Sequence, residues 1–504
     1  MNRTVYLFFL FLIIYLAANT GLASDDFNDL LSYGKISTLN TLIPQTSWLT
    51  TPLISYTHLI WYHFSDFNNI ALIGMLKILY LLLSFYMVSR FFGLYTDKIN
   101  AALVSFFFLF FPSHDSTVYW FLGQYLTLTI SCYLYAYYLA YRDRLVAAAF
   151  MATAASFISY GSPPIALALF IILILERKFI KSVVIFLPNV IYSIYYFFVT
   201  KAMSSGVDHV PADLSLSSMG GRFLLQLGAF IDATIGPSIW IKIYYSLLQL
   251  SPVSIIIGIA AAVLLYRAGL KGSRRYDPRL IAGFTVLALS SIFVFSVTGK
   301  YTVIAFNLGN RTTIFGSLLV AYLAVMMPAW KAMRYAILIV LLFSILGISD
   351  HWKAWNAHVG RVTANIMRNE KLQGHGEGVI FVSGNQYSKF GPIRHIEFFS
   401  EAEALSSYFM LLSNNRIVAT PLNRRHHYEN GRVTDTKYGT SEDARGHITV
   451  YDSEKDEVLD IPSEEINSYI ASLAPDNRHW IQLVDNEKIK QIILKIMPRL
   501  KYAL

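Results

Sequence analysis

Long apolar runs alternate with short polar segments over residues 1–350, and this pattern organises the chain. A helix that crosses a bilayer needs about 20 predominantly apolar residues with few charges. The pattern predicts about eleven transmembrane helices. They are Thr4–Ala23, Asn69–Phe91, Asn100–Phe111, Val118–Tyr141, Leu145–Ile158, Pro164–Leu175, Ser182–Thr200, Pro252–Leu270, Leu280–Thr298, Thr312–Pro328 and Tyr335–Ile348.

Two further stretches are apolar on one side only and are predicted to lie along the membrane interface. One is the aromatic segment Leu49–Phe64, and the other is Arg222–Leu248, which Gly236-Pro237 interrupts. The first run also has features of a cleavable signal peptide, because Met1-Asn2-Arg3 precedes it and small residues end it. Its length favours a retained helix, and either outcome places the following residues outside the cytoplasm.

Lys and Arg residues concentrate in alternate loops, and this asymmetry predicts the orientation. The loops Ser113–Thr117 and Ser159–Pro163 contain none. The opposite loops contain Arg90, Lys98, Arg142, Arg144, Arg177, Lys178, Lys181, Arg267, Lys271, Arg274, Arg275, Arg279, Lys331 and Arg334. The N-terminus is therefore expected on the cytoplasmic side of the membrane, and the tail on the opposite side. The expected membrane is a bacterial-type inner (plasma) membrane.

The hydropathy falls after residue 350, so we expect a membrane domain at 1–350 and a small extracytoplasmic α/β domain at 351–504. In the tail, the pattern predicts a polar, irregular loop over Asn423–Gly446. The predicted strands are Val379–Val382, Arg416–Thr420 and His447–Tyr451, and the predicted helices are Ile466–Leu473, Asn486–Met497 and one that a capping box at Ser400–Glu403 opens through Leu412.

Composition supports a polytopic membrane protein, since 55% of the residues are hydrophobic and only 14% are charged. The net charge of +9 comes without a basic stripe interleaved with aromatics, so nucleic acid is not an expected partner. The single cysteine, Cys132, excludes an internal disulfide and a Cys-based metal site. The chain also lacks a Walker loop, a GxSxG elbow, HExxH and CxxC.

Candidate chemistry begins at Ser24-Asp25-Asp26-Phe27, directly after the first apolar run. Ionisable groups at a membrane edge are functional candidates, and a positioned carboxylate is suited to activate a hydroxyl as a general base. The alternative is that the chain has simply reached water.

Asp115 follows His114 in the second outer loop, and Arg311 opens a late helix. The planar guanidinium of an Arg suits a phosphate leaving group. The alternatives are an N-cap for Asp115 and an interfacial anchor for Arg311. Four histidines also have structural alternatives. His58 and His63 are expected on an aromatic interfacial face rather than at a metal, and His426 and His427 are expected in a solvated loop.

This arrangement resembles the GT-C superfamily of membrane glycosyltransferases. The resemblance rests on Asp25-Asp26-Phe27, the interfacial segment Leu49–Phe64, His114-Asp115 before Tyr119-Trp120, and Asn310-Arg311. It implies a polytopic helical core, an acidic residue in the first outer loop that acts on the acceptor, and a polyprenyl-phosphate or polyprenyl-diphosphate sugar as donor.

The resemblance also implies residue roles. Asp25 or Asp26 would be the catalytic base, and Asp115 a supporting acid or metal ligand. Because neither of the first two outer loops contains a DxD sequence, no metal or other cofactor is indicated. The implied donor-phosphate contacts are Arg311, Lys300 and Arg222, and the implied pocket residues are His114, Tyr119, Trp120 and His58.

The sequence thus predicts an inverting transferase that moves a lipid-linked sugar to a cell-envelope glycan, glycolipid or protein. One alternative is an envelope polysaccharide polymerase or ligase, although the loop Lys201–Gly221 is short for that class. Another is a lipid-linked-glycan transporter or flippase, although the spans are nearly free of charge. A third is a non-catalytic partner in which the tail is the working part.

Overall fold

The computed structural model describes residues 2–34, 50–63, 65, 70–202, 215–268, 276–298, 303–327, 330–376, 378–413, 416–437, 439–475 and 477–496. The chain divides into two compact units. The first comprises Met1–Asn19, Thr38–Trp61 and Ala71–His351, and the second comprises Thr20–Ser37, Tyr62–Ile70 and Trp352–Leu504. The sequence placed a boundary after residue 350, and the second unit also includes two segments from the N-terminal region.

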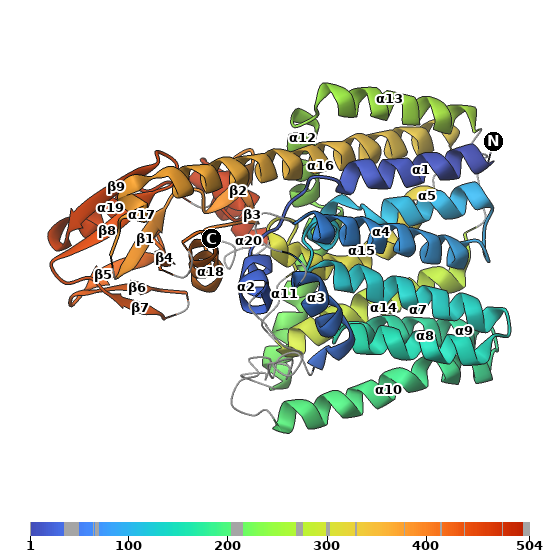
Figure 1. Ribbon diagram of the computed structural model, residues 1–504. Helices are drawn as coiled ribbons and strands as arrows, with labels where there is room; N and C mark the ends of the chain where they lie inside the picture. Colours follow the sequence, from blue (N-terminus) through green and yellow to red (C-terminus); the bar gives the residue numbers. More distant parts are fainter. Residues whose placement is uncertain are drawn as a thin grey trace. The chain divides into compact units, whose positions relative to one another are not determined.

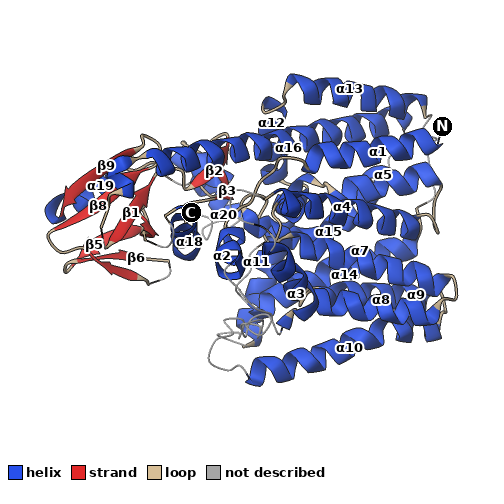
Figure 2. Cartoon of the chain, in the orientation of Figure 1, coloured by secondary structure: helices blue, strands red, loops and turns tan. Residues whose placement is uncertain are grey.

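The described part of the first unit is built from helices (Figures 1 and 2). They are α1 (Asn2–Ala17), α3 (Pro52–His63, which ends in the second unit), α4 (Ala71–Phe92), α5 (Lys98–Leu109), η3 (Pro112–His114), α6 (Ser116–Tyr119), α7 (Gln124–Tyr141), α8 (Leu145–Ile158), α9 (Ser162–Leu175), α10 (Phe179–Ala202), α11 (Leu216–Thr234), α12 (Pro237–Leu248), α13 (Pro252–Arg267), α14 (Pro278–Thr298), η4 (Leu308–Thr313), α15 (Ile314–Met326) and α16 (Lys331–Arg368, which continues into the second unit).

Within the described residues, 6 helical stretches are long and apolar enough to cross a membrane. They are Ala71–Phe92, Phe179–Lys201, Leu216–Leu248, Pro278–Val297, Leu308–Met326 and Lys331–Arg368. Other apolar helices of this unit, such as α1 and α8, are shorter than the roughly 20 residues that a straight span needs. A helical membrane protein is therefore supported, whereas the predicted count of about eleven spans is not confirmed.

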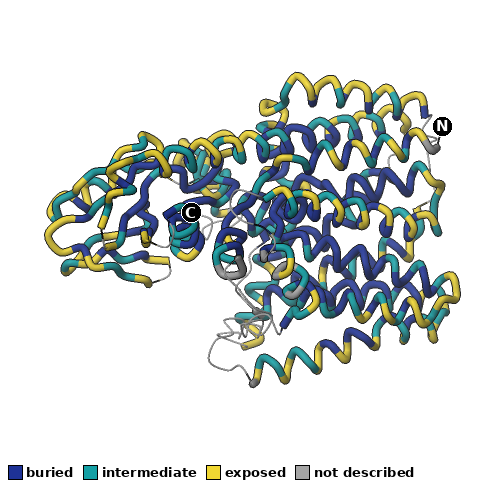
Figure 3. Tube along the Cα trace, in the orientation of Figure 1, coloured by how far each residue is buried: buried dark blue, intermediate teal, exposed yellow. Residues whose placement is uncertain are grey.

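The outer helices expose large apolar side chains, which a lipid environment would cover. In α10 the exposed fraction of Ile180 is 73% and that of Phe197 is 60%, and in α13 that of Ile256 is 68%. Figure 3 shows exposed residues along both helices. The central helix α5, by contrast, is buried from Asn100 to Leu109. Such extensive apolar exposure is unusual for a protein surrounded by water.

The stretch predicted to lie at the interface, Arg222–Leu248, forms two helices, and Leu216–Leu248 is apolar enough to be a candidate span. The break falls at Gly236-Pro237, as expected for a proline in the first turn of a helix. The carboxylate of Asp232 accepts a hydrogen bond from the backbone N–H of Ser238 at 3.2 Å. This contact joins α11 to the start of α12.

The second unit combines helices with small sheets (Figure 2). Its strands are β1 (Val379–Ser383), β2 (Tyr387–Phe390), β3 (Ile393–Glu397), β4 (Val418–Pro421), β5 (His426–Glu429), β6 (Arg432–Asp435), β7 (Ser441–Asp443), β8 (His447–Asp452) and β9 (Glu457–Pro462). Its other elements are α2 (Asp25–Gly34), α17 (Glu370–Gln373), α18 (Ala402–Leu412), η5 (Ser463–Glu465), α19 (Ile466–Ser472), η6 (Trp480–Leu483) and α20 (Glu487–Ile496).

The main sheet has the order β4-β1-β8-β9. β1 pairs in parallel with β4 and β8, and β9 pairs antiparallel with β8. Two antiparallel sheets, β2-β3 and β5-β6-β7, complete the strands. One buried cluster joins strands to α19, with Phe381, Val450 and Ile466 among its members.

The predicted strands near residues 379, 418 and 447 and the predicted helices near residues 402, 466 and 487 are confirmed. The predicted loop Asn423–Gly446 is wrong, because β5, β6 and β7 form a sheet there. The turn between β5 and β6 is Asn430-Gly431, and both residues have positive φ, 52° and 77°. An Asn-Gly pair is a strong hairpin signal, since both turn positions require φ > 0.

His426 is likewise not in a solvated loop, although His427 is exposed. His426 lies buried in β5, where its Nε2 is 3.6 Å from Asp435 Oδ2. Burial lowers its pKa to about 4, although the nearby Asp435 charge opposes this shift. The capping box predicted at Ser400 is also absent: the N-cap of α18 is Glu401, which makes no side-chain capping bond.

Candidate functional site

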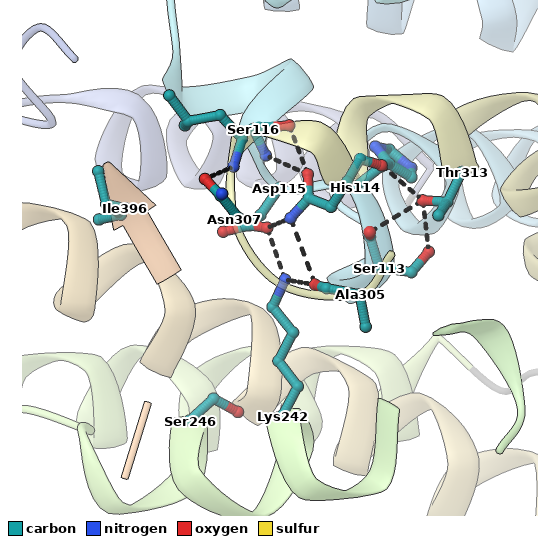
Figure 4. Close-up of polar contacts among 12 residues, drawn as sticks. Ser113, His114, Asp115, Ser116, Lys242, Ser246, Ala305, Asn307, Thr313 and Ile396 are labelled. Atoms are coloured by element: carbon teal, nitrogen blue, oxygen red, sulfur yellow. Dashed lines mark hydrogen bonds and ion pairs between the residues drawn. The ribbon is translucent and has the colours of Figure 1, made fainter. Parts of the chain in front are cut away.

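A buried ion pair lies among the helices of the first unit. Lys242 of α12 donates from Nζ to Asp115 Oδ1 at 2.7 Å, and the exposed fractions of the two side chains are 0% and 2%. Figure 4 shows the Lys242 side chain extending to this carboxylate. A charge buried in an apolar setting is costly unless a partner compensates it. Removing either partner alone would therefore leave an uncompensated charge in the interior.

Asn310 completes this cluster from η4. Its Nδ2 donates to Asp115 Oδ1 at 2.5 Å, and its Oδ1 accepts from the backbone N–H of Ser116 at 3.2 Å. Lys242 Nζ also donates to the backbone carbonyl of Ala305 at 2.7 Å. The cluster thus joins the loop before α6, helix α12 and the loop before η4, which are far apart in the sequence.

The loop that presents the Ala305 carbonyl contains an unusual backbone conformation. Asn307 has φ 65° and ψ 167°, and its side chain accepts from the backbone N–H of Leu308 at 2.6 Å. Residues other than glycine seldom adopt this region, which costs about 1–3 kcal/mol. Such local strain persists only when surrounding contacts over-determine it, as those of Ala305 and Asn310 do here.

Small residues allow α16 to approach α12 closely, and this contact positions Lys242. A Cβ atom on Gly347 would overlap the backbone carbonyl of Ser246. The hydroxyls of Ser246 and Ser344 are 2.9 Å apart. One face of α12 is consequently buried, with Ile239, Lys242, Ile243 and Ser246 on it.

His114 is part of this buried network, and its side chain is fully buried. Its Nδ1 is 2.8 Å from Thr117 Oγ1, and its Nε2 is 2.9 Å from the carbonyl of Phe108. Burial lowers the pKa of His114 to about 4, so the ring is neutral near pH 7. Ser113 and Thr313 add a second tie nearby, because Thr313 Oγ1 donates to the carbonyl of Ser113 at 2.8 Å.

Arg311 and Trp120, which the sequence placed in one site, are in contact. The guanidinium carbon of Arg311 lies 4.8 Å from the centroid of the Trp120 ring. Arg311 is half-buried, whereas Trp120 is buried. Tyr119 is also buried. A planar guanidinium is suited to bidentate contact with an anion.

The N-cap alternative for Asp115 does not hold. Asp115 stands at the N-cap position of α6, but its side chain makes no capping hydrogen bond. Its Oδ1 instead accepts from Lys242 and Asn310. A carboxylate occupied in this way is suited to hold neighbouring groups in place rather than to take a proton from a substrate.

A second cluster of acids occupies the start of α2, in the second unit. Asp26 is fully buried: its Oδ2 accepts from the backbone N–H of Ala23 at 3.0 Å, and its Oδ1 accepts from the Tyr62 hydroxyl at 3.1 Å. Asp25 is exposed, and Ser24 Oγ donates to it at 3.4 Å. The two adjacent carboxylates therefore have different surroundings.

The proximity of these acids affects their neighbours. The pKa of Asp29 is raised well above 3.8, first by burial and then by the charges of Asp25 and Asp26. The pKa of the Tyr62 hydroxyl is raised well above 10.0 by burial and by the Asp26 charge. Burial and like charges both disfavour an additional negative charge, which is a common property of sites that handle protons.

Packing against α18 fixes α2 within the second unit. Phe27 makes an edge contact with Tyr408 at 4.9 Å between ring centroids, and it also packs against Phe398 at 6.2 Å. Ser407 Oγ donates to Asn28 Oδ1 at 3.1 Å. These contacts define the orientation of the first turn of α2, where Asp25 lies.

The predicted site residues are therefore distributed over both units. Asp25 and Asp26 belong to the second unit, whereas Asp115 and the Arg311–Trp120 pair belong to the first. Arg222 lies half-buried in α11 of the first unit. Lys300 and the side chain of His58 are outside the described residues. No group of three or more His, Cys, Asp or Glu side chains that could hold a metal occurs among the residues that the structure describes.

Lys242 is the residue that sequence reasoning missed. It lies in a stretch that was interpreted as interfacial, and its partner Asp115 is 127 positions away. A signal was nevertheless present, since Lys242 is the single charged residue of α12, in the sequence PSIWIKIYYSLL.

No family model and no curated protein matches this chain.

Proposed function

We propose that this chain is a membrane glycosyltransferase that transfers a sugar from a polyprenyl-phosphate carrier to a cell-envelope acceptor, with Asp25 as the general base. One observation carries the proposal. At the first turn of α2, directly after the first apolar helix, Asp26 is buried and hydrogen-bonded while the adjacent Asp25 is exposed. A base must be both accessible and positioned.

In this proposal the two carboxylates divide the work. Asp26 anchors the turn through Tyr62 and the Ala23 amide, and it is a positioning residue. Asp25 takes the proton of the acceptor hydroxyl as that oxygen attacks the anomeric carbon and the carrier phosphate leaves. Inversion at the anomeric carbon follows from such a single displacement.

Within the first unit, we separately assign Arg311 as a contact for a phosphate group. Its guanidinium stacks on Trp120, and a planar guanidinium is suited to bidentate contact with two phosphate oxygens. Asp115 acts indirectly, because it accepts a hydrogen bond from Asn310 and so positions the residue next to Arg311. Its expected role is therefore structural support of the phosphate contact and not proton transfer.

The test compares Asp25→Asn with Asp26→Asn in cells that carry each variant in place of the unmodified chain. Asp25→Asn should lower transfer about 10²–10⁴-fold with normal membrane insertion, since that is the usual contribution of a general base. Asp26→Asn should mainly reduce the yield of folded protein, because Asp26 is a positioning residue. Asp485→Asn, at another exposed aspartate, is the matched control. If cells that carry Asp25→Asn have a normal surface-glycan composition, the proposal is wrong.

A transporter of lipid-linked glycans is the second candidate, and the Asp115–Lys242 pair favours it. Lys242 lies within the candidate span Leu216–Leu248, and charges inside spans are typical of transport pathways. The two functions separate in detergent solution, where no compartments exist. A transferase still forms the glycosidic bond there from a polyprenyl-phosphate sugar, whereas a transporter forms none.

A further inference from the structure

A cavity of about 560 Å³ opens among four helices of the first unit. The beginnings of α1 and α5 and the ends of α4 and α7 line it. Its volume is within the usual range for sites that bind small molecules. The four helix ends belong to the side on which the sequence predicts the cytoplasm.

The polar lining of this cavity is basic and aromatic. Arg90, Lys98 and Arg142 line it, and no carboxylate from the described part of the chain does. The Arg90 guanidinium lies 4.9 Å from the centroid of the Tyr86 ring, and that of Arg142 lies 5.7 Å from the centroid of Tyr138. A guanidinium carries five N–H donors, so an arginine that contacts a tyrosine ring can still donate to an anion.

The acids that neighbour these cations in sequence are occupied elsewhere. Asp97 caps α5 and accepts from the backbone N–H groups of Ile99 at 2.9 Å and Asn100 at 3.1 Å. Asp143 pairs with Lys181 at 2.6 Å. The lining residue Ser89 adds a buried hydroxyl that has no hydrogen-bond partner among the described residues. The cavity thus combines positive charge with an unused polar group.

We propose that this cavity binds the phosphate headgroup of an anionic phospholipid. The three basic residues would contact the phosphodiester oxygens, and the Ser89 hydroxyl would supply one more hydrogen bond. Apolar side chains complete the lining, Val5, Leu7 and Ile99 among them, and Leu7 is 64% exposed. This apolar part suits an acyl chain and gives no advantage to a soluble anion. Basic pockets between transmembrane helices on the cytoplasmic side are suited to such headgroups. The proposal is independent of the glycosyltransferase assignment.

The test is a titration of the detergent-solubilised full chain with phosphatidylglycerol, followed by native mass spectrometry. Arg90→Gln/Arg142→Gln should weaken the apparent affinity about 30-fold, from the usual contribution of two basic residues at an anionic headgroup. Arg90→Lys/Arg142→Lys should retain most of the affinity. The matched control Arg144→Gln/Arg177→Gln removes two exposed arginines that do not line the cavity and should change nothing.

Two further arms separate the sources of the phosphate. Phosphatidylcholine should bind at least tenfold more weakly than phosphatidylglycerol, because its headgroup is neutral overall. Inorganic phosphate should not displace the lipid at equal concentration. Equal affinity of both double Gln variants, or full displacement by inorganic phosphate, would overturn the proposal. All substituted residues are exposed, so a folded protein is expected in each case.

Discussion

Asp115 of the helical unit and Asp26 of the second unit are both buried carboxylates, but their partners differ. In the helical unit, Asp115 faces Lys242 at 2.7 Å, so the local charge is balanced. In the second unit, Asp26 is fully buried beside Asp25 and Asp29, and the acceptor bonds described for it come from the Tyr62 hydroxyl and a backbone amide. The first arrangement suits the joining of helices, and the second suits a change in protonation.

The comparison separates residues that sequence reasoning had treated as equivalent. Asp25, Asp26 and Asp115 all follow apolar runs and all were candidate catalytic acids. Their surroundings differ because Lys242 reaches only one of them. A carboxylate paired with a buried cation favours its charged form strongly, whereas like charges lower that preference.

The largest expected effect comes from removing Lys242. Lys242→Met leaves Asp115 buried without its cation, which should cost about 3–5 kcal/mol of unfolding free energy. The double variant Lys242→Met/Asp115→Asn should recover most of this loss, because no buried charge remains. The measurement is the unfolding midpoint in detergent. A single variant as stable as the unmodified protein would show that the pair does not hold the helices.

The second unit should respond to pH through two groups with opposite shifts. Burial and the Glu401 charge raise the pKa of Glu397 to about 7, so stability from this group falls as pH rises from 4.5 toward 7. The pKa of His426 is lowered to about 4, so stability from that group falls as pH drops from 6.5 toward 4. Between pH 4.5 and 6.5 the two slopes nearly cancel.

Glu397→Gln should therefore expose the His426 slope, up to about 1.4 kcal/mol per pH unit, with stability rising from pH 4.5 to 6.5. His426→Gln should give a slope of the other sign. Hydrogen exchange of β5 and β6 peptides, corrected for intrinsic rates, measures both. Identical pH profiles for the two variants would contradict the assignment.

A smaller effect is expected at the anchor of Asp26. Tyr62→Phe deletes the hydroxyl that donates to the buried carboxylate, which should cost about 1–3 kcal/mol. The exposed Tyr244 offers a matched control, since Tyr244→Phe removes a hydroxyl with no described hydrogen bond. Thermal unfolding of the purified chain compares the two. Equal midpoints would mean that the hydroxyl does not stabilise Asp26.

The smallest effect is expected at the strained residue Asn307. This residue lies in the loop that presents the Ala305 carbonyl to Lys242. Glycine adopts φ near 65° freely, so Asn307→Gly should be nearly neutral, although it loses the bond to Leu308. Asn307→Ala should be less stable than the Gly variant by about 1 kcal/mol. Chemical denaturation of both variants gives the difference. An Ala variant as stable as the Gly variant would show that the loop relaxes.

Much of the fold follows from local pattern. The apolar runs locate the helices α4, α5 and α14, and the alternation near residue 447 locates β8. The number of spans did not follow, because short helices such as α8 fall below the length that a single span requires. The β5-β6-β7 sheet was missed because polar composition was given more weight than the Asn430-Gly431 turn signal.

The sites show a sharper limit. Asp25, Asp26 and Asp115 could be selected from the sequence. Arg311 and Trp120 were selected for separate roles, and their side chains are in contact in the structure. Sequence reasoning did not predict Lys242 or the buried state of Asp26, because both depend on contacts with residues far away in the chain. Long-range pairing of this kind leaves no periodic signal.

The most direct test compares Asp25→Asn and Asp115→Asn for both activity and stability in one preparation. Our account predicts that Asp25→Asn loses at least about 100-fold in sugar transfer with an unchanged unfolding midpoint. It predicts that Asp115→Asn lowers the midpoint, because Lys242 loses its charge partner, while transfer per folded molecule stays within tenfold. The reverse result, with Asp115→Asn inactive and stable and Asp25→Asn active, would contradict the division of roles between the two units.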